Sequence, residues 1–135
     1  MEIKYTGLIK RIQSIFVDTL LMILLMFISA EVFDKIGFIN EENEALARGL
    51  VFFGVWGVYE PVGMTLGSTL GNYLVGIRVR KYDNIDKKIN IFQAYGRFII
   101  KLFLGWLSFI TISMNKEKRT IHDLVAGTIV IDIKK

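Results

Sequence analysis

Cysteine is absent from the 135 residues of this chain, and histidine occurs once, as His122. The missing cysteines exclude disulfide bonds and thiolate metal sites, and a single histidine leaves no cluster of the usual kind for zinc. The chain also lacks a GxxxxGK[ST] phosphate loop, a GxSxG nucleophile turn and an HExxH helix. We therefore expect a protein that is not an enzyme, with no catalytic residues, no cofactor and no metal site.

The chain is poor in charged side chains and rich in apolar ones. Charged residues make up 22% of it, hydrophobic residues make up 53%, and the mean hydropathy is +0.46. Such values are typical of membrane proteins. The net charge is +4, but the basic residues flank apolar segments and do not form one dense stripe. We expect the lipid bilayer to be the partner of these bases, and no nucleic acid.

Residues 12–30 form the first long apolar segment, in which Asp18 is the only charged residue. As a helix this segment is about 28 Å long, enough for a bilayer core of about 30 Å. A cleaved signal peptide is the alternative interpretation, because the sequence Ile-Ser-Ala at residues 28–30 resembles a cleavage site. The segment is longer than a signal core and contains an acid, so we predict a transmembrane helix.

A second transmembrane helix is predicted over residues 46–66, after an acidic linker at residues 31–48. In the linker, Asn40 is followed by Glu41 and Glu42. This pattern is typical of a helix N-cap with acids in the first turn. We therefore expect the second helix to begin at Asn40, outside the membrane.

Residues 74–80 and 128–134 alternate polar and apolar side chains, with many β-branched residues. Such a pattern is typical of short strands. A third apolar segment, residues 91–114, separates the two. We predict an all-α membrane protein with two transmembrane helices, this third re-entrant or spanning segment, and a small cytoplasmic two-strand β-ribbon. Residues 1–135 are expected to form a single domain.

The distribution of lysine and arginine predicts the orientation, because basic residues stay on the cytoplasmic side. The linker at residues 31–48 has two of them, whereas residues 67–101 have seven and residues 115–135 have five. We therefore expect the linker to be extracytoplasmic and the N-terminus to be cytoplasmic.

A complete third crossing by residues 91–114 would place the basic tail outside and separate the two strands. A re-entrant or in-plane hairpin, bent near Gly105, would keep both strands on the cytoplasmic side. Arg97 and Lys101 lie one helical turn apart in the first half of this segment, which favours a helix at the interface. We predict the hairpin, with a third span as the alternative.

Asp18 and Glu60 are carboxylates inside the two predicted spans, where charges usually serve function or pair within a bundle. Arg11 shares a helix face with Asp18 but lies about 10 Å away along the axis, too far for a direct bond. Pro61 follows Glu60 and can leave the carbonyl oxygen of Gly57 free. Because Asp18 and Glu60 lie at similar depth, we expect them to share a proton or a small monovalent cation, with the Gly57 carbonyl assisting. The alternative is a purely structural pair.

In the tail, Thr120 and Asp123 match the start of a helix, with Thr120 as N-cap and Asp123 capping in return. The alternative hypothesis places Asp123 in a charge cluster with Arg11 and Asp18. His122 is a candidate proton relay that titrates near pH 6.5, and an exposed, merely solvated histidine is the other interpretation.

The chain contains two motifs, TLGNYLVGIRV and HDLVAGTIV, and its first span carries an arginine and an aspartate. Together these features resemble the RDD family of small bacterial membrane proteins. The family's arginine and two aspartates match Arg11, Asp18 and Asp123. The supporting matches are Thr69, Gly71, Gly76, Arg78, Val79, Gly127 and Thr128. Asn72 departs from the pattern, because family members often carry a basic residue there. The resemblance implies a bacterial cytoplasmic membrane, and it suggests transport, including sodium/proton exchange.

Three functions remain open from the sequence. The first is cation/proton exchange through Asp18 and Glu60, with Arg11 and Asp123 at the cytoplasmic mouth; two spans cannot enclose a pathway, so this requires a homo-oligomer. The second is a module without transport activity that binds or regulates another membrane protein. The third is a lipid-interface protein that uses Trp106 and nearby bases at the headgroups.

Overall fold

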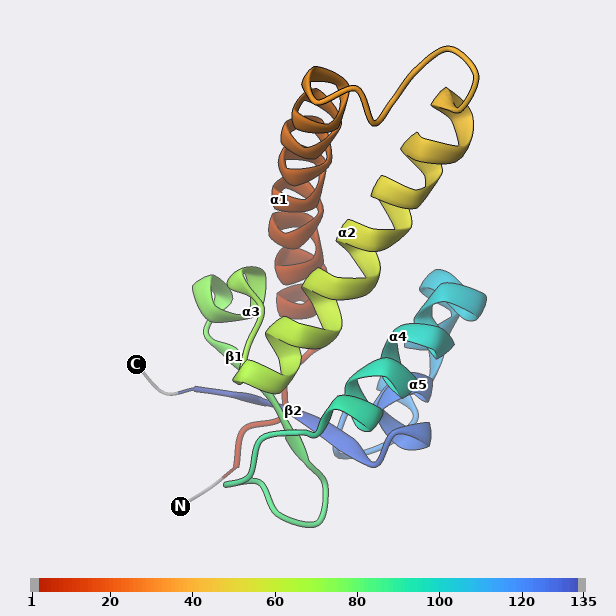
Figure 1. The fold of residues 1–135 in the computed structure, drawn as a ribbon. Helices are drawn as coiled ribbons and strands as arrows, with labels where there is room; N and C mark the ends of the chain where they lie inside the picture. Colours follow the sequence, from red (N-terminus) through yellow and green to blue (C-terminus); the bar gives the residue numbers. More distant parts are fainter. Residues whose placement is uncertain (1–2, 134–135) are drawn as a thin grey trace.

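A computed structural model describes residues 3–133, most of which are helical (Figure 1). The helices are α1 (Leu8–Lys35), α2 (Glu44–Leu66), α3 (Leu70–Val75), α4 (Ile91–Leu104), the 3-10 helix η1 (Gly105–Ser113) and α5 (Ile121–Val125). The strands are β1 (Ile77–Lys81) and β2 (Thr128–Asp132). Within the described residues, three helical stretches are long and apolar enough to cross a membrane: α1, α2 and the continuous stretch Ile91–Ser113 formed by α4 and η1. The predicted mostly helical membrane protein with a small two-stranded sheet is confirmed.

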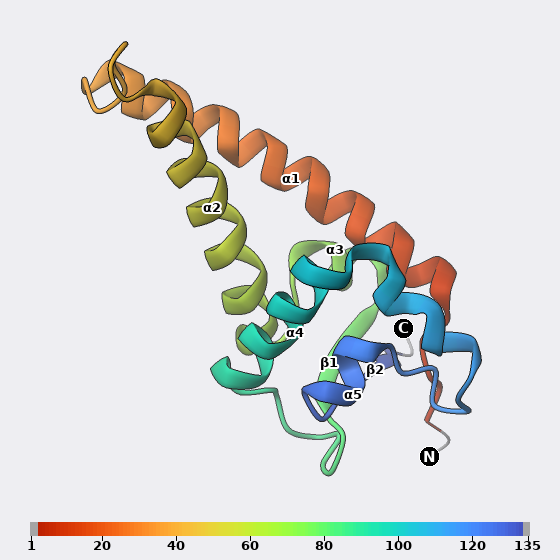
Figure 2. The same ribbon diagram turned by 90° about the vertical axis from the view of Figure 1, so that its right-hand side faces the viewer.

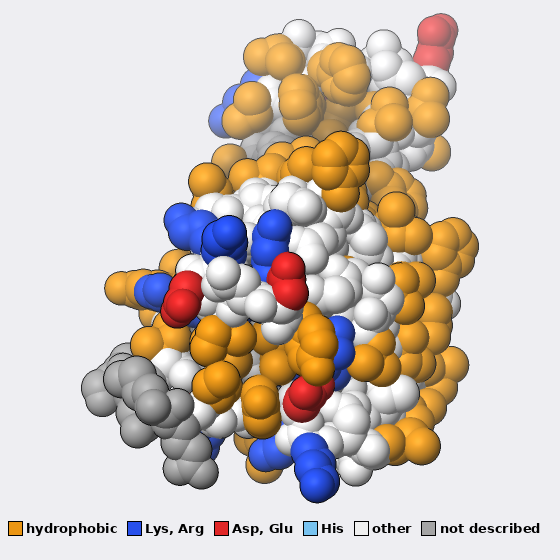
Figure 3. Space-filling view, turned by 90° about the horizontal axis from the view of Figure 1, so that it is seen from below, with side chains coloured by type: hydrophobic (Ala, Val, Ile, Leu, Met, Phe, Trp, Pro, Cys, Tyr) orange, Lys and Arg blue, Asp and Glu red, His pale blue; other side chains and the backbone are white. Residues whose placement is uncertain are grey.

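Helices α1 and α2 are joined at the end of the molecule away from the sheet and cross at an angle (Figure 1 and Figure 2). The short elements gather at the sheet end, where α3 packs against α1 and α4 packs against α2. Both long helices expose large apolar side chains, among them Phe16 and Phe27 on α1 and Phe53 on α2. Lipid is the natural solvent for such a surface. Seen from the sheet end, side chains of both charge signs occupy the face while apolar side chains cover its flank (Figure 3).

Helix α2 begins later than the sequence pattern predicts. Its N-cap is Asn43 and its first residue is Glu44. Asn40 instead lies in the preceding turn, where its side-chain oxygen accepts the backbone N–H groups of Glu42 and Asn43. The prediction of Asn40 as the N-cap is wrong, because its side chain closes this local turn.

The first predicted strand, residues 74–80, is also partly wrong. The chain forms α3 up to Val75, because Thr69 caps the helix and Gly76 ends it with a left-handed φ of +75°. Strand β1 therefore begins only at Ile77 and pairs antiparallel with β2. The second predicted strand is confirmed over residues 128–132, and residue 134 lies outside the described residues.

The sheet is stabilised by helices on one face. Ile77, Val79 and Val130 are almost fully buried and form a cluster with Met64 of α2 and Ala94 of α4. A two-stranded ribbon is marginal in water without such cover. This packing fixes the ends of α2 and α4 against the sheet, close to the functional residues described below.

The third apolar segment bends at Gly105, where the φ of +53° favours glycine. Before the bend it is the α-helix α4, and after it the 3-10 helix η1. Both α4 and η1 contact α5, so the chain returns to the sheet end of the molecule after the bend. The predicted bend near Gly105 is confirmed, and it lets β1 and β2 pair across the long sequence gap between them.

Candidate functional site

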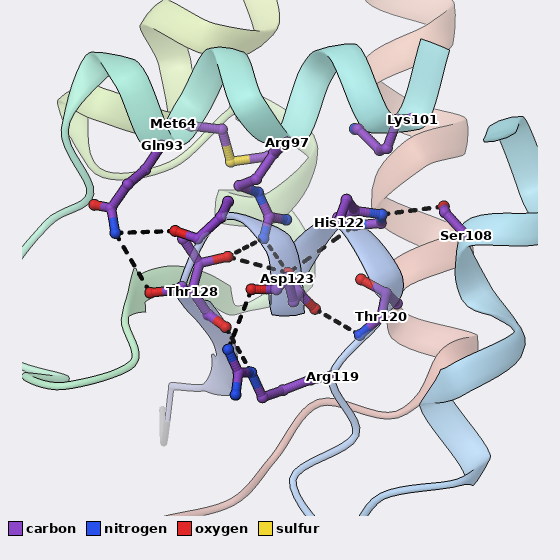
Figure 4. Close-up of polar contacts among 12 residues, drawn as sticks. Met64, Gln93, Arg97, Lys101, Ser108, Arg119, Thr120, His122, Asp123 and Thr128 are labelled. Atoms are coloured by element: carbon purple, nitrogen blue, oxygen red, sulfur yellow. Dashed lines mark hydrogen bonds and ion pairs between the residues drawn. The ribbon is translucent and has the colours of Figure 1, made fainter. Parts of the chain in front are cut away.

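Asp123 is the centre of a buried ionic cluster. Its side chain is fully buried on α5 and accepts a 2.6 Å hydrogen bond from Nη1 of Arg11, at the start of α1. Its other oxygen accepts a hydrogen bond from Nη1 of Arg97 on α4, which also donates to Thr128 (Figure 4). The structure brings Arg11 and Asp123 together as the sequence hypothesis requires. Arg97 also belongs to this cluster, which the sequence pattern did not predict.

The local structure around α5 holds the Asp123 carboxylate in place. Asp123 Oδ2 accepts the backbone N–H of Thr120 at 3.1 Å, so the capping role and the cluster role of Asp123 coexist. Arg119 donates to the backbone oxygens of Asp123 and Thr128 and thereby joins α5 to β2. Burial would raise the pKa of Asp123, but the charges of Arg97 and Arg11 outweigh burial and hold it well below its ordinary value.

His122 is buried at 2% exposure, which contradicts the expectation of an exposed histidine. Its Nδ1 lies 3.0 Å from Oγ of Ser108 on η1, and its Nε2 lies 4.0 Å from Asp123 (Figure 4). Burial, and next the charge of Arg97, lower the pKa of His122 to about 2. The imidazole is therefore neutral at pH 7, and the expected titration near pH 6.5 is wrong because η1 folds over α5 and excludes water.

Asp18 has three hydrogen-bond donors. Oδ1 accepts from the hydroxyl of Tyr59 at 2.7 Å and from the backbone N–H of Gly71 at 2.8 Å, and Oδ2 accepts from Thr69 at 2.7 Å. A Cβ at Gly71 would lie 2.2 Å from the carbonyl oxygen of Ser14, so only glycine permits this approach. Asp18 thus joins α1 to α2 and to the start of α3. The role of Tyr59 was missed, because no local pattern connects it to a residue 41 positions earlier.

Glu60 forms an ion pair with Lys101 of α4, and both side chains are mostly buried. Asp18 and Glu60 have different partners in the structure: Asp18 accepts a hydrogen bond from Tyr59, and Glu60 accepts one from Lys101. The structure therefore does not show the direct sharing of a proton or cation that the sequence suggested. Pro61 lies inside α2, which continues to Leu66. Gly57 also lies in α2 and is not among the residues that line the cavity described next.

A cavity of about 690 Å³ lies between α1, α2, α4 and η1. Its charged lining residues are Arg11, Asp18, Glu60, Arg97 and Lys101. Its apolar lining includes residues of α1 and α2: Ile12, Ile15, Met22, Met26, Phe52 and Trp56. The structure therefore places Arg11, Asp18, Glu60 and His122 on one cavity. Asp123 does not line it but is hydrogen-bonded to two residues that do, Arg11 and Arg97.

The sequence model of the RDD family matches residues 5–127, which is nearly the whole chain. A protein of Haemophilus influenzae with the printed name "Uncharacterized protein" is 34% identical over 77 residues. That match covers 53% of this chain and 49% of the relative, so the chain spans about half the length of the relative it matches. No solved structure matches the chain. Because this match covers nearly the whole chain, the chain belongs to the RDD family.

Proposed function

We propose that this protein exchanges protons for a small monovalent cation across a membrane, and that Glu60 and Lys101 are the exchanging pair. The observation that carries the proposal is an ion pair of mostly buried side chains that lines a cavity between apolar helices. Ionisable residues inside spanning segments are costly, and they commonly mark ion pathways or proton relays.

The chemistry of the pair balances charge and protons. A monovalent cation that binds the Glu60 carboxylate displaces the Lys101 ammonium from it. In a site of low dielectric, two neighbouring positive charges repel strongly, so Lys101 releases its proton to the opening of the cavity. When the site opens to the other side of the membrane, a proton from that side reprotonates Lys101, restores the ion pair and expels the cation to that side. One cation thus moves for one proton.

Asp18 has a supporting role in this proposal. Its three hydrogen bonds hold α1 against α2 and against the start of α3. Arg11 lines the cavity and is held there by its ion pair with Asp123. This assignment replaces the direct sharing between Asp18 and Glu60 that the sequence suggested.

The topology of the proposal follows the basic residues. The sheet end and the N-terminus face the cytoplasm of a bacterium, and the connection between α1 and α2 is extracytoplasmic. In this proposal the α4 and η1 segment is re-entrant, and the contacts of both of its parts with α5 support that arrangement. A single protomer has few helices to enclose a pathway, so a second copy of the chain completes it.

The proposal is tested with purified protein in sealed vesicles that hold a proton gradient. We expect addition of sodium or lithium to collapse the gradient with the native protein. The variants Glu60→Gln and Lys101→Met should each abolish the response. The matched control is Glu44→Gln, because Glu44 forms an exposed ion pair with Arg48 in the same helix.

Two results contradict the exchange. One is no flux from folded native protein, and the other is a full response from folded Glu60→Gln vesicles. Absent flux together with a membrane protein that co-purifies at fixed stoichiometry would favour the alternative function, a module that binds or regulates another membrane protein.

A further inference from the structure

A second pocket lies where the end of α2, the start of α3 and strand β1 meet. Its volume is about 390 Å³, and it shares no lining residue with the cavity described above. Its charged lining residues are Arg78, Arg80 and Lys88, and no acid lines it. We call it the basic pocket.

The basic pocket carries an excess of positive charge. None of its three bases forms an ion pair within residues 3–133. Residues 78–88 contain five bases and two acids, so the surrounding segment is positive as well. Burial, and next the charge of Arg78, lower the pKa of Arg80, and the opposing effect of Asp86 is smaller. Asp18 reaches Thr69 beside the pocket, but this one carboxylate leaves the excess positive.

The bases retain donors that a ligand can reach. Nη1 of Arg80 donates to two backbone carbonyl oxygens, whereas its Nε and Nη2 have no hydrogen bond within the described residues. Neither atom is enclosed, because the enclosed nitrogens without a partner in the described chain are Nε of Arg11 and Nε of Arg97. Lys88 donates one N–H to the carbonyl oxygen of Leu66 at 2.7 Å, and an ammonium has three. Such donors around one pocket suit phosphate oxygens.

The rim of the basic pocket is apolar and lies at the end of a helix that is long enough to cross a membrane. Leu66, the last residue of α2, is 71% exposed, and Tyr73 of α3 is 63% exposed. Lipid headgroups lie just outside the hydrocarbon core, where tyrosine and basic side chains are common. A lipid can therefore place its phosphate in the pocket and its acyl chains against the rim.

We infer that the basic pocket binds the headgroup phosphate of an anionic phospholipid through Arg78, Arg80 and Lys88, while the acyl chains contact Leu66 and Tyr73. The observation behind it is a pocket with three basic side chains and no acid at the end of an apolar helix. The inference does not rest on the proposed exchange, because the pocket is separate from the cavity and lipid binding is measured without an ion gradient.

Native mass spectrometry of the full chain, released from an uncharged detergent, tests this inference because it counts the lipids that stay bound. We expect a single phosphatidylglycerol to bind with a dissociation constant about tenfold lower than that of phosphatidylcholine. Both lipids contain a phosphate, but the choline group of phosphatidylcholine would add a positive charge beside three bases.

Two variants locate the site, and a neighbouring lysine provides the matched control. Lys88→Gln and Arg78→Gln each remove one donor and one charge, so each should weaken phosphatidylglycerol binding about tenfold. Lys87→Gln makes the same change of charge at an exposed position outside the pocket. It should weaken binding by less than about twofold, because salt screens exposed charges. Unfolding midpoints without lipid check that the three variants fold.

Any of three outcomes overturns the inference. Equal binding of the two lipids would show apolar contact without recognition of charge. Equal losses in Lys88→Gln and Lys87→Gln would show a general effect of surface charge. Displacement of phosphatidylglycerol by inorganic phosphate at equal concentration would show a site for a soluble anion, because a bound lipid also has its acyl chains at the rim.

Discussion

The guanidinium of Arg11 donates a 2.6 Å hydrogen bond to the carboxylate of Asp123, which lies 112 residues further along the chain. This contact joins the start of α1 to α5, the short helix before β2. Because Arg97 binds the other oxygen of the same carboxylate, Asp123 connects α1, α4 and α5 at one point.

We expect Asp123→Asn to destabilise the protein strongly. The change removes the only negative charge from a buried cluster with two arginines. Breaking a buried ion pair on one side costs about 3 to 5 kcal/mol. Thermal unfolding in detergent measures the loss, with the exposed Asp34→Asn on α1 as the control. An unfolding midpoint of Asp123→Asn within 2 °C of the native protein's would contradict a central role for this carboxylate.

The three donors to Asp18 predict a coupled effect of Asp18 and Tyr59. Tyr59→Phe removes one donor and should cost about 1 kcal/mol, and Asp18→Asn should cost about 1 to 3 kcal/mol because donors are left unpaired. The double variant should cost less than the sum, since the two changes remove the same bond. Tyr95→Phe, with its more exposed ring, is the control. Full additivity would show that the Tyr59 bond to Asp18 does not form in solution.

Gly71 should not tolerate a side chain. A Cβ there would lie 2.2 Å from the carbonyl oxygen of Ser14 and 2.7 Å from Cγ of Asp18. We expect Gly71→Ala to cost about 1 to 3 kcal/mol or more, because α3 has to move away from α1. Gly54→Ala in α2 has open space around its Cβ and should be neutral or stabilising by about 1 kcal/mol. Equal unfolding midpoints for the two variants would refute the close approach.

The buried His122 predicts a pH dependence of stability. Its pKa falls from 6.5 to about 2 on folding. The unfolded chain therefore binds a proton below pH 6.5 that the native protein excludes, and stability falls as the pH decreases from 6.5 toward 2. The slope is about 1.4 kcal/mol per pH unit. The pKa of Asp123 is also lowered on folding, which stabilises the native protein. That stability is lost only as the pH falls below 3.8, the ordinary pKa of an aspartate.

The measurement is the unfolding midpoint in detergent between pH 7.5 and pH 4.5. His122→Asn keeps a polar atom near Ser108 without a group that titrates in this range, so its midpoint should vary less with pH than that of the native protein. Parallel curves for the two proteins would mean that His122 is accessible to protons in the native state.

Labelling of single cysteines tests the re-entrant segment, and the native chain provides a background without cysteine. We expect cysteines at Asp86 and Lys116 to react on the same side of the membrane, because both ends of the α4 and η1 segment contact the sheet end. A cysteine at Glu42 should react on the opposite side. Labelling of Asp86 and Lys116 from opposite sides would establish a complete third crossing.

The sequence by itself determined the apolar helices, the bend at Gly105 and the second strand, whereas the first strand begins later than its pattern predicts. These features depend on local properties: the length of an apolar segment against bilayer thickness, a glycine between two apolar halves, and the alternation of side chains in residues 128–132. Even the start of α5 was predictable, because the capping pair of Thr120 and Asp123 is close in sequence.

Only the tertiary structure decided the partners of the charged side chains. Asp18 meets donors 41 to 53 residues away, and Glu60 meets Lys101, because α2, α3 and α4 converge on α1. His122 is buried because η1 folds back over α5. A charged residue in a membrane segment predicts that some partner exists, but the packing of distant helices decides which partner it is. The sequence suggested one site shared by Arg11, Asp18, Glu60 and Asp123. The structure has two ionic clusters instead, Arg11 and Arg97 with Asp123, and Lys101 with Glu60.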